Sequence, residues 1–287
     1  MRSLIIVAAL ALPAAAQDMP GPFASFDIAS EPVLADPHDL AFGPDGRLYV
    51  ADKFGARIAV FDPETLELIE YLGEGYLAGA HDISFGADWR VAVSATGHGA
   101  VALYEGIGAL DAPPATGVQA PGTEGALLHS NGFLYVTAGG AGLVAKFGRE
   151  RLLGAVQGFP GAHDLAEAPD GSIWVAHNRA RKLVRLSPDL EPLQEIGGAQ
   201  YRFIGPRYMD ITPEGLLVVA DQEGHRVLLI DPLDGEDGRL LGVLGDGTPG
   251  MGPGKFDDPE GVAVDGARFY ISDSDNNRIV RYVTVMN

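Results

Sequence analysis

A single repeated pattern limits what this chain can fold into. Its clearest copy runs from Pro37 to Phe61 and reads as three short apolar strands, separated by a Pro-Asp-Gly turn and a polar turn. Leu66 to Tyr71 supplies a fourth strand. Aligning the chain with itself finds the same register six times, at steps of 39 to 53 residues. The residues that open the six copies are His38, His81, Glu124, His163, Arg207 and Glu260.

Six four-stranded units of this length predict one all-β domain, a six-bladed β-propeller over residues 17–287. A blade is a sheet that cannot bury both faces until its neighbours stack on it, so the units should close into a ring. The last unit ends before it can form a fourth strand, whereas the segment from Phe23 to Ala29 has strand character. We expect this N-terminal strand to complete the last blade, because closure removes an exposed sheet edge.

The first 16 residues have the form of a secretory signal peptide. Arg2 supplies a positive start, and Leu4 to Leu12 is an apolar run too short to span a bilayer. Ala14 to Ala16 fits the small-residue pattern that precedes a cleavage site. We therefore predict cleavage between Ala16 and Gln17 and a secreted or periplasmic product.

The charge of the chain argues against two classes of partner. The sequence has 39 acidic residues against 20 lysines and arginines, a formal net charge of −19, and no cysteine. An acidic surface repels phosphate-rich polymers and anionic lipids, so we expect neither a nucleic-acid partner nor a membrane partner. Without cysteine the chain has no disulfide and no thiolate metal ligand. A protein partner stays open.

Three of the hairpins place an acid five residues before a base across a tight turn. These pairs are Asp52 with Arg57, Asp221 with Arg226 and Asp273 with Arg278. Together with the opening of the last unit, Asp258-Pro-Glu-Gly-Val-Ala-Val-Asp265, they resemble the NHL repeat. The resemblance is strongest in units one, five and six, and it implies a propeller of the NHL or TolB-like kind. We interpret the pairs as structural ties across each turn.

The residues that open the six units are all polar, although a purely structural position would tolerate apolar ones. The first strand of a blade lines the central channel, so these side chains should project toward one axis. Three converging neutral imidazoles can hold a divalent ion and leave one coordination position open. The sequence therefore predicts a metal site of His38, His81 and His163, with Glu124 and Glu260 in the same ring. Zinc is the expected ion and calcium the alternative.

An aspartate follows each of these histidines, at Asp39, Asp82 and Asp164. A carboxylate in that position could orient its imidazole by accepting a hydrogen bond from a ring nitrogen. In the alternative interpretation there is no metal. The polar ring then faces channel water, and each histidine is hydrogen-bonded to the aspartate that follows it.

The segments Pro37-His-Asp-Leu and Ala162-His-Asp-Leu resemble blade openings of peptidyl-α-hydroxyglycine α-amidating lyase. That family is a six-bladed NHL-type propeller with zinc held in its channel by three histidines, and it splits a hydroxyglycine-extended peptide into an amide and glyoxylate. The resemblance implies that His38, His81 and His163 ligate zinc, and that a tyrosine and arginines assist proton transfer.

The hairpins that would carry the family's tyrosine have none in this sequence. Tyr208 and Arg207, which open the fifth unit, are therefore our candidates for the catalytic side chains. Tyr76 and Tyr201, in loops that lead into the histidine register, are the alternatives.

Three classes of function remain open, and the sequence does not decide whether the protein is an enzyme. The first is a metal-dependent lyase or hydrolase with a small-molecule or peptide substrate in the channel. The second is a non-catalytic propeller that binds a ligand or a protein on one face. The third is a lactone hydrolase of the gluconolactonase kind. It is the least favoured, because the ring offers histidines where a calcium cage would use asparagines.

Overall fold

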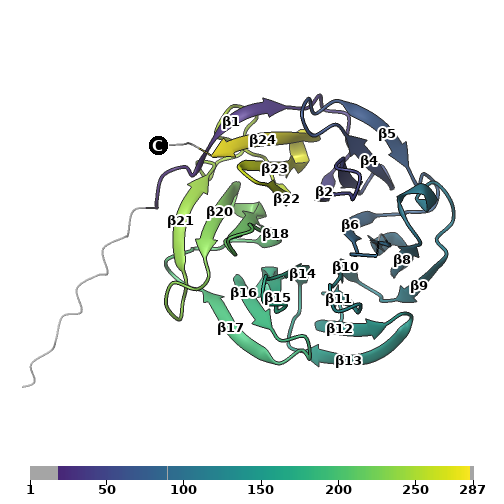
Figure 1. Ribbon diagram of the computed structural model, residues 1–287. Coiled ribbons are helices and arrows are strands. Elements are labelled where there is room, and N and C mark those ends of the chain that lie inside the picture. Colours follow the sequence, from purple (N-terminus) through teal and green to yellow (C-terminus); the bar gives the residue numbers. More distant parts are fainter. Residues whose placement is uncertain (1–18, 89, 285–287) are drawn as a thin grey trace, which may run out of the picture.

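The chain folds into a ring of six antiparallel sheets around a central channel (Figure 1). The structure is a computed structural model that describes residues 19–88 and 90–284. Each sheet has four strands, so the predicted six-bladed propeller is confirmed. The predicted signal peptide, residues 1–16, lies outside the described residues. Within the described ranges, no helix has the length and apolar character needed to cross a membrane.

The strands of a blade follow one another from the channel outward. Blade 1 contains β2 (Pro37–Phe42), β3 (Leu48–Asp52), β4 (Arg57–Phe61) and β5 (Leu68–Leu72). Blade 2 contains β6 (Ala80–Phe85), β7 (Val91–Ala95), β8 (Ala100–Tyr104) and β9 (Thr116–Gln119). Blade 3 contains β10 (Thr123–Leu128), β11 (Leu134–Ala138), β12 (Leu143–Gly148) and β13 (Arg151–Gln157).

The other three blades repeat this order. Blade 4 contains β14 (Ala162–Glu167), β15 (Ile173–His177), β16 (Lys182–Leu186) and β17 (Pro192–Gly197). Blade 5 contains β18 (Pro206–Ile211), β19 (Leu217–Asp221), β20 (Arg226–Asp231) and β21 (Arg239–Leu244). Blade 6 contains β22 (Pro259–Asp265), β23 (Arg268–Asp273), β24 (Arg278–Thr284) and the N-terminal β1 (Ala24–Ala29).

The N-terminal strand closes the ring, as the sequence predicts. β1 pairs antiparallel with β24, with Ala24 opposite Thr284 and Ala29 opposite Val280. This pairing covers the outer edge of β24 and ties the first strand of the chain to the last one. In the described chain this closure gives the sixth blade its fourth strand and covers an edge of β24 that would otherwise be open to pairing.

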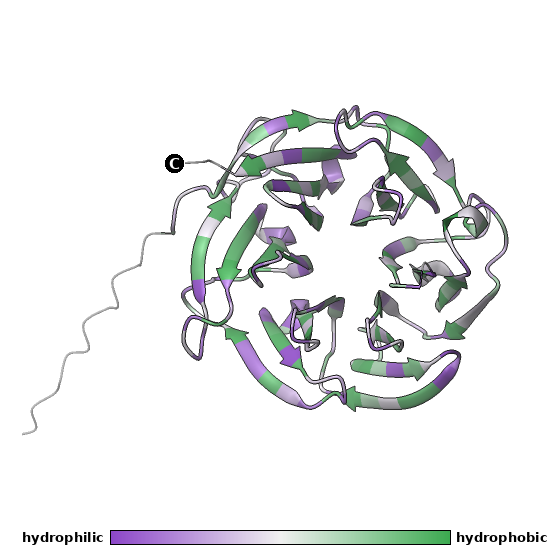
Figure 2. Ribbon diagram, viewed as in Figure 1, coloured by the Kyte–Doolittle hydropathy of each residue, from purple (hydrophilic) through white to green (hydrophobic). Residues whose placement is uncertain are grey.

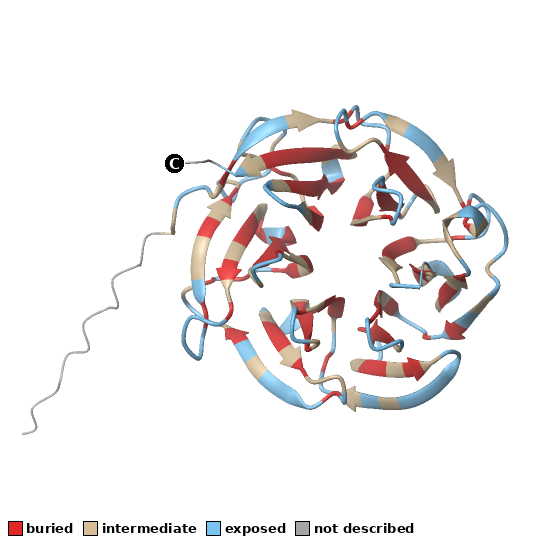
Figure 3. Cartoon of the chain, in the orientation of Figure 1, coloured by how far each residue is buried: buried red, intermediate tan, exposed pale blue. Residues whose placement is uncertain are grey.

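The hydrophobic core lies between neighbouring blades. Tyr49 and Val60 of blade 1, for example, pack in one cluster with Ile83 and Val93 of blade 2. Apolar residues dominate the inner strands (Figure 2), which are buried, whereas the outermost strands carry most of the exposed positions (Figure 3). The second strand of each blade is thus covered by neighbouring blades on both faces, which explains its continuous apolar run in the sequence.

A β-bulge interrupts the first strand of every blade near its opening polar residue. In β2 the ladder partners jump from Pro37 to Leu40, so that His38 and Asp39 lie outside the regular pairing. The same kind of register shift occurs in β6, β10, β14, β18 and β22. A bulge redirects side chains, and here it frees two consecutive polar residues to face the channel.

The aspartates that follow the histidines join neighbouring blades. Asp39 Oδ2 accepts a hydrogen bond from Ile83 N of blade 2 at 3.2 Å, and Asp164 Oδ2 accepts one from Met209 N of blade 5 at 2.7 Å. No hydrogen bond or ion pair between described residues connects a ring histidine to the aspartate that follows it. The interpretation of these aspartates as partners of the histidines is therefore wrong, because their carboxylates bind backbone N–H groups instead.

The three Asp/Arg pairs are structural ties, as expected, and they are more deeply buried than a surface ion pair. Asp221 has no exposed surface, and its Oδ2 accepts a hydrogen bond from Arg226 Nε at 2.9 Å. Its other oxygen accepts hydrogen bonds from Ile204 N and Gly205 N. Each tie thus fixes a hairpin to the loop that enters the blade.

Candidate functional site

The predicted polar ring forms a layer across the channel, between two cavities. We call one the entrance cavity. It measures about 440 Å³, and its lining includes Asp36, Lys53, Arg207, Asp258, Glu260 and Asp275. We call the other the aspartate cavity. It measures about 340 Å³, and its lining includes Asp39, Asp82, Asp164 and Asp210. The first strands of all six blades run in the same direction along the channel. Residues that precede the polar layer in sequence, such as Asp36 and Asp258, therefore line the cavity at one end, and residues that follow it, such as Asp39 and Asp82, line the cavity at the other end.

Hydrogen bonds fix the tautomer of His81. The hydroxyl of Tyr208 donates to the carbonyl oxygen of His81 at 2.8 Å, and the same hydroxyl lies 2.7 Å from His81 Nδ1. When the hydroxyl proton is given to the carbonyl oxygen, both contacts are hydrogen bonds only with the ring proton on Nδ1, and we assign this tautomer. Burial, and then the positive charge of His38, hold the pKa of His81 well below its usual range. His81 is therefore neutral, with its lone pair on Nε2.

His163 adopts the same tautomer by a different route. Its Nδ1 donates to the carbonyl oxygen of Gly161 at 3.1 Å, and its Nε2 accepts from Arg207 Nη1 at 2.6 Å. Burial, and then the charge of Arg207, hold the pKa of His163 well below its usual range. This ring is also neutral, and its lone pair also points into the layer.

The carboxylate of Glu124 lies between these two lone pairs. Its Oε2 is 3.2 Å from His81 Nε2 and 3.8 Å from His163 Nε2. Burial raises the pKa of Glu124 above its usual value. His163 Nε2 already accepts from Arg207, whereas Glu124 Oε2 and His81 Nε2 are two electron-rich atoms that would be stabilised by a proton or a cation between them.

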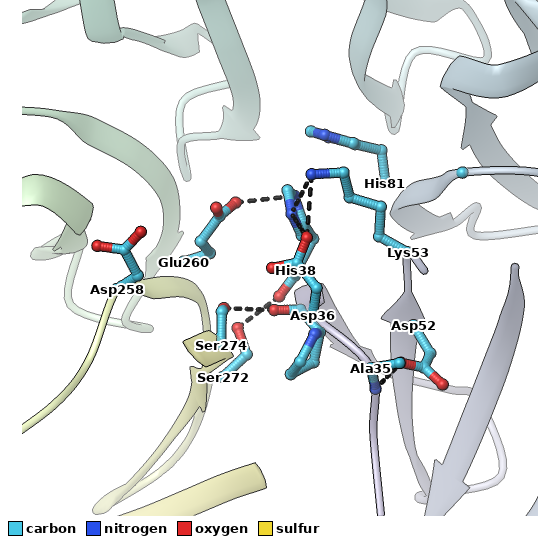
Figure 4. A network of polar contacts seen from close by, with 12 residues as sticks. Ala35, Asp36, His38, Asp52, Lys53, His81, Asp258, Glu260, Ser272 and Ser274 are labelled. Carbon is cyan, nitrogen blue, oxygen red and sulfur yellow. Dashed lines mark hydrogen bonds and ion pairs between the residues drawn. The ribbon is translucent and has the colours of Figure 1, made fainter. Parts of the chain in front are cut away.

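His38 lies between two other carboxylates and a lysine (Figure 4). Its Nδ1 is 2.7 Å from Glu260 Oε2, and its Nε2 is 3.3 Å from Asp36 Oδ2 and 3.0 Å from Lys53 Nζ. Although burial opposes the charged ring, Glu260 and Asp36 outweigh it and raise the pKa of His38. The close Nδ1 and Oε2 atoms lack hydrogen-bond geometry with any partner among the described residues.

The layer therefore brings the predicted residues together in two halves. The ring centroids of His38 and His81 are 4.1 Å apart, and those of His81 and His163 are 6.3 Å apart. His38 belongs to a group whose potential ligand atoms all lie within 4.8 Å of one another, together with Asp36 and Glu260. In the described part of the chain the three histidines do not form such a group. Glu124 Oε2 lies between His81 Nε2 and His163 Nε2, at 3.2 and 3.8 Å, but among the described residues these three do not form such a group either.

The two predicted catalytic residues occupy different environments. Tyr208 is fully buried, and its hydroxyl contacts His81. Arg207 lines the entrance cavity, where its Nε donates to Gln222 Oε1 at 2.6 Å. The alternative tyrosines lie elsewhere: Tyr201 donates to the carbonyl oxygen of Asp237, and Tyr76 lines a separate cavity. Of these four residues, only Arg207 combines contact with the layer and access to the entrance cavity.

Sequence reasoning did not single out Lys53, Gln222 and Ser274, which line the entrance cavity. Each is the residue directly after the aspartate of an Asp/Arg pair. The buried aspartate fixes the hairpin, so the next side chain is held at the channel mouth. This position in the repeat was the available signal. Asp36 was missed because it precedes the aligned register by two residues.

Comparison with known families identifies the repeats. The NHL repeat matches residues 34–61 and 256–282, which lie in blades 1 and 6. The chain therefore carries NHL repeats within a six-bladed propeller. Among curated proteins, none matches the chain.

Solved structures share the fold at low sequence identity. A structural-genomics protein of unknown function from Bacteroides thetaiotaomicron has a TM-score of 0.70 at 16% identity, covering 93% of this chain and 73% of that one. An auxiliary nutrient binding protein from the same organism has a TM-score of 0.67 at 19% identity, with 87% and 69% covered. Virginiamycin B lyase from Staphylococcus aureus has a TM-score of 0.60 at 12% identity, with 88% and 96% covered. An enzyme and a binding protein thus share this fold.

Proposed function

We propose that this protein is an exported metal-dependent enzyme whose metal site lies in the polar layer of the channel. One observation carries the proposal: Glu124 Oε2 lies 3.2 Å from His81 Nε2 and 3.8 Å from His163 Nε2, whose present donor is Arg207. Neutral imidazoles and a carboxylate are the donors that zinc takes in sites without cysteine.

Zinc fits this donor set better than calcium. Calcium prefers six to eight oxygen ligands, whereas the layer offers three imidazoles and only two carboxylates, those of Glu124 and Glu260. His81, His163 and Glu124 would hold the ion, and His38 with Glu260 would complete the ring beside it. A bound zinc ion supplies Lewis acidity, which polarises a carbonyl or lowers the pKa of a hydroxyl or a water molecule.

Two further side chains have separate roles in our proposal, one toward the metal site and one toward the substrate. Tyr208 is a positioning residue, since its hydroxyl keeps the ring proton of His81 on Nδ1 and thereby leaves the Nε2 lone pair free. Arg207 reaches both the layer and the entrance cavity, where its guanidinium can contact an anionic group of a substrate. The substrate is a small molecule or a peptide, and the reaction is a lyase or hydrolase reaction.

Titration of the purified protein with Zn²⁺ by calorimetry tests the metal site. The expected result is one ion per chain, with affinity at least about tenfold lower in His81→Ala, His163→Ala and Glu124→Gln. His98→Ala is the matched control, because His98 is exposed in the turn between β7 and β8 of blade 2. Unchanged affinity in the three site variants, or no zinc uptake by the wild type, would overturn the proposal.

The lyase activity has its own test. A hydroxyglycine-extended peptide with a free amino terminus should release glyoxylate in the presence of the wild-type protein and Zn²⁺, and less glyoxylate with the Arg207→Ala variant. Zinc binding without any turnover of this peptide would exclude the α-hydroxyglycine lyase reaction and leave hydrolase chemistry for the same site.

A second candidate is a non-catalytic propeller that binds an organic ligand in the channel. It is favoured by the two cations that already face histidine nitrogens: Lys53 Nζ lies 3.0 Å from His38 Nε2, and Arg207 Nη1 lies 2.6 Å from His163 Nε2. In that case both histidines serve as acceptors for these donors. Ligand binding that is insensitive to chelators and to Zn²⁺ would support this candidate over the first.

A further inference from the structure

The charges around the entrance cavity are unequally matched. Both cations in its lining have partners, because Lys53 Nζ lies 3.0 Å from Asp36 Oδ2, and Arg207 contacts Gln222 and His163. Asp258 and Asp275 also line this cavity. Among the described residues, neither has a lysine or arginine within ion-pair distance, and the only side-chain hydrogen bond of Asp258 comes from Gln222 Nε2 at 3.2 Å. The unmatched charge is therefore negative.

A buried carboxylate at the floor of the same cavity also lacks a full set of partners. Glu260 is 3% exposed and receives one hydrogen bond, from Gln222 Nε2 to Oε1 at 2.8 Å. Its Oε2 has no hydrogen-bond partner in the described structure, although His38 Nδ1 is 2.7 Å away in a poor direction and Arg207 Nη1 is 3.9 Å away, at ion-pair distance. Burying a carboxylate oxygen without a partner is costly, so this atom is suited to accept from a donor that enters the cavity.

An exposed aromatic side chain stands beside these carboxylates. Phe54 lines the entrance cavity and is 74% exposed, more than any other large apolar residue described. Lys53 Nζ lies 4.7 Å from the centre of its ring. A ring held open at a cavity mouth offers apolar surface, and a face for a cation, to a ligand rather than to the core of the protein.

We propose that the entrance cavity binds a ligand that carries an ammonium group next to an apolar or aromatic group. The ammonium group lies among Asp258, Glu260 and Asp275, and the apolar part packs on Phe54. This ligand class would be the substrate class of the proposed enzyme. Binding in the entrance cavity does not depend on the metal site, whereas turnover of the ligand does. A primary amine of a small molecule or the amino terminus of a peptide has this chemistry.

Three probes of similar size test the charge preference by calorimetry: phenethylamine, 3-phenylpropionate and 3-phenylpropanol. The expected result is measurable binding of phenethylamine, with the other two binding at least about tenfold more weakly. Asp275→Asn and Phe54→Ala should each weaken phenethylamine binding by roughly fivefold or more. Asp189→Asn and Leu233→Ala are matched controls, since both residues are exposed and neither lines the cavity.

Two outcomes would overturn the inference. One is tighter binding of 3-phenylpropionate than of phenethylamine, and the other is unchanged phenethylamine binding in both Asp275→Asn and Phe54→Ala. Zinc titrations of the same variants separate this result from the metal site, because neither residue belongs to the polar layer. Lost amine binding with wild-type zinc affinity supports the inference. Amine binding that persists in His81→Ala, when zinc binding is lost, also supports it.

Discussion

The hydroxyl of Tyr208 in blade 5 bonds twice to His81 in blade 2, on the opposite side of the channel. It accepts from His81 Nδ1 at 2.7 Å and donates to the backbone oxygen of His81 at 2.8 Å. Blades 2 and 5 are three steps apart in a ring of six. One phenol group therefore spans the channel and fixes the orientation of an imidazole.

Removal of this hydroxyl should cost stability and release His81. In Tyr208→Phe the buried carbonyl oxygen of His81 loses its donor, so we expect the free energy of unfolding to fall by about 1–3 kcal/mol, measured with urea. Tyr71→Phe is the control, because the hydroxyl of Tyr71 donates to Val33 O at 2.8 Å in an exposed region where water can replace it. Equal losses of unfolding free energy in the two variants would contradict a stabilising role for the hydrogen bonds between Tyr208 and His81.

The tautomers of His81 and His163 predict an NMR signature. At pH 7 both rings should appear in long-range ¹H–¹⁵N spectra as neutral imidazoles protonated on Nδ1, since their pKa values are lowered by burial and nearby positive charge. The unfolded chain takes up these protons near pH 6.5 and the folded chain does so only at lower pH. The stability from these two rings is therefore present above pH 6.5 and is lost as the pH falls. Imidazolium spectra at pH 6 would contradict this assignment.

Arg207 should compete with a metal for His163. Its Nη1 lies 2.6 Å from His163 Nε2 and brings a positive charge to the layer. Arg207→Gln removes both the guanidinium donor to His163 Nε2 and its positive charge. We therefore expect roughly tenfold tighter Zn²⁺ binding in calorimetry. Arg239→Gln is the control, because Arg239 is exposed on an outer strand, paired with Asp234. Weaker binding in Arg207→Gln would mean that the guanidinium supports the ion instead.

The repeat register predicted the polar layer because equivalent residues of stacked blades must approach the same axis. His38, His81 and His163 accordingly line one channel. The hydrogen-bond partner of Asp39 could not be predicted in this way. The bulge that frees Asp39 from the ladder depends on backbone geometry, and its partner is Ile83 N in another blade.

The division of the layer into two halves was also beyond sequence reasoning. It depends on rotamers, which select Glu260 as the neighbour of His38 and Glu124 as the neighbour of His81 and His163. A register fixes which residues reach the channel. It does not fix which nitrogen faces which oxygen, since this is set by the side chains of all six blades together.

The buried Asp/Arg ties should contribute far more stability than exposed ion pairs. Asp221 is fully buried and accepts from Arg226, Ile204 N and Gly205 N. Asp221→Ala therefore leaves two amides without their acceptor and removes the carboxylate that neutralises Arg226, which keeps only backbone carbonyl acceptors. We expect a loss of about 3–5 kcal/mol in the free energy of unfolding. Glu195→Ala, which removes the exposed partner of Lys182, should cost less than about 1 kcal/mol. Urea unfolding of both variants checks the difference, and similar costs would contradict it.

The aspartate cavity predicts a pH dependence of opposite sign to that of the histidines. Burial raises the pKa of Asp210 from its usual 3.8 to about 6, although its oxygens accept from Ile211 N and Val264 N. The folded state therefore binds this proton more tightly than the unfolded state does. The stability from Asp210 is fully present below pH 3.8 and is lost as the pH rises through about 6.

Asp210→Asn should reduce this loss, because an amide does not titrate. We expect the decline in the free energy of unfolding between pH 4 and pH 6 to shrink by about 1–2 kcal/mol in the variant. Asp189→Asn is the control, since the Asp189 side chain is 87% exposed. The comparison needs urea unfolding at several pH values in one buffer system. An unchanged slope in Asp210→Asn would show that the channel leaves this carboxylate charged in the folded protein, with water or a cation as its partner.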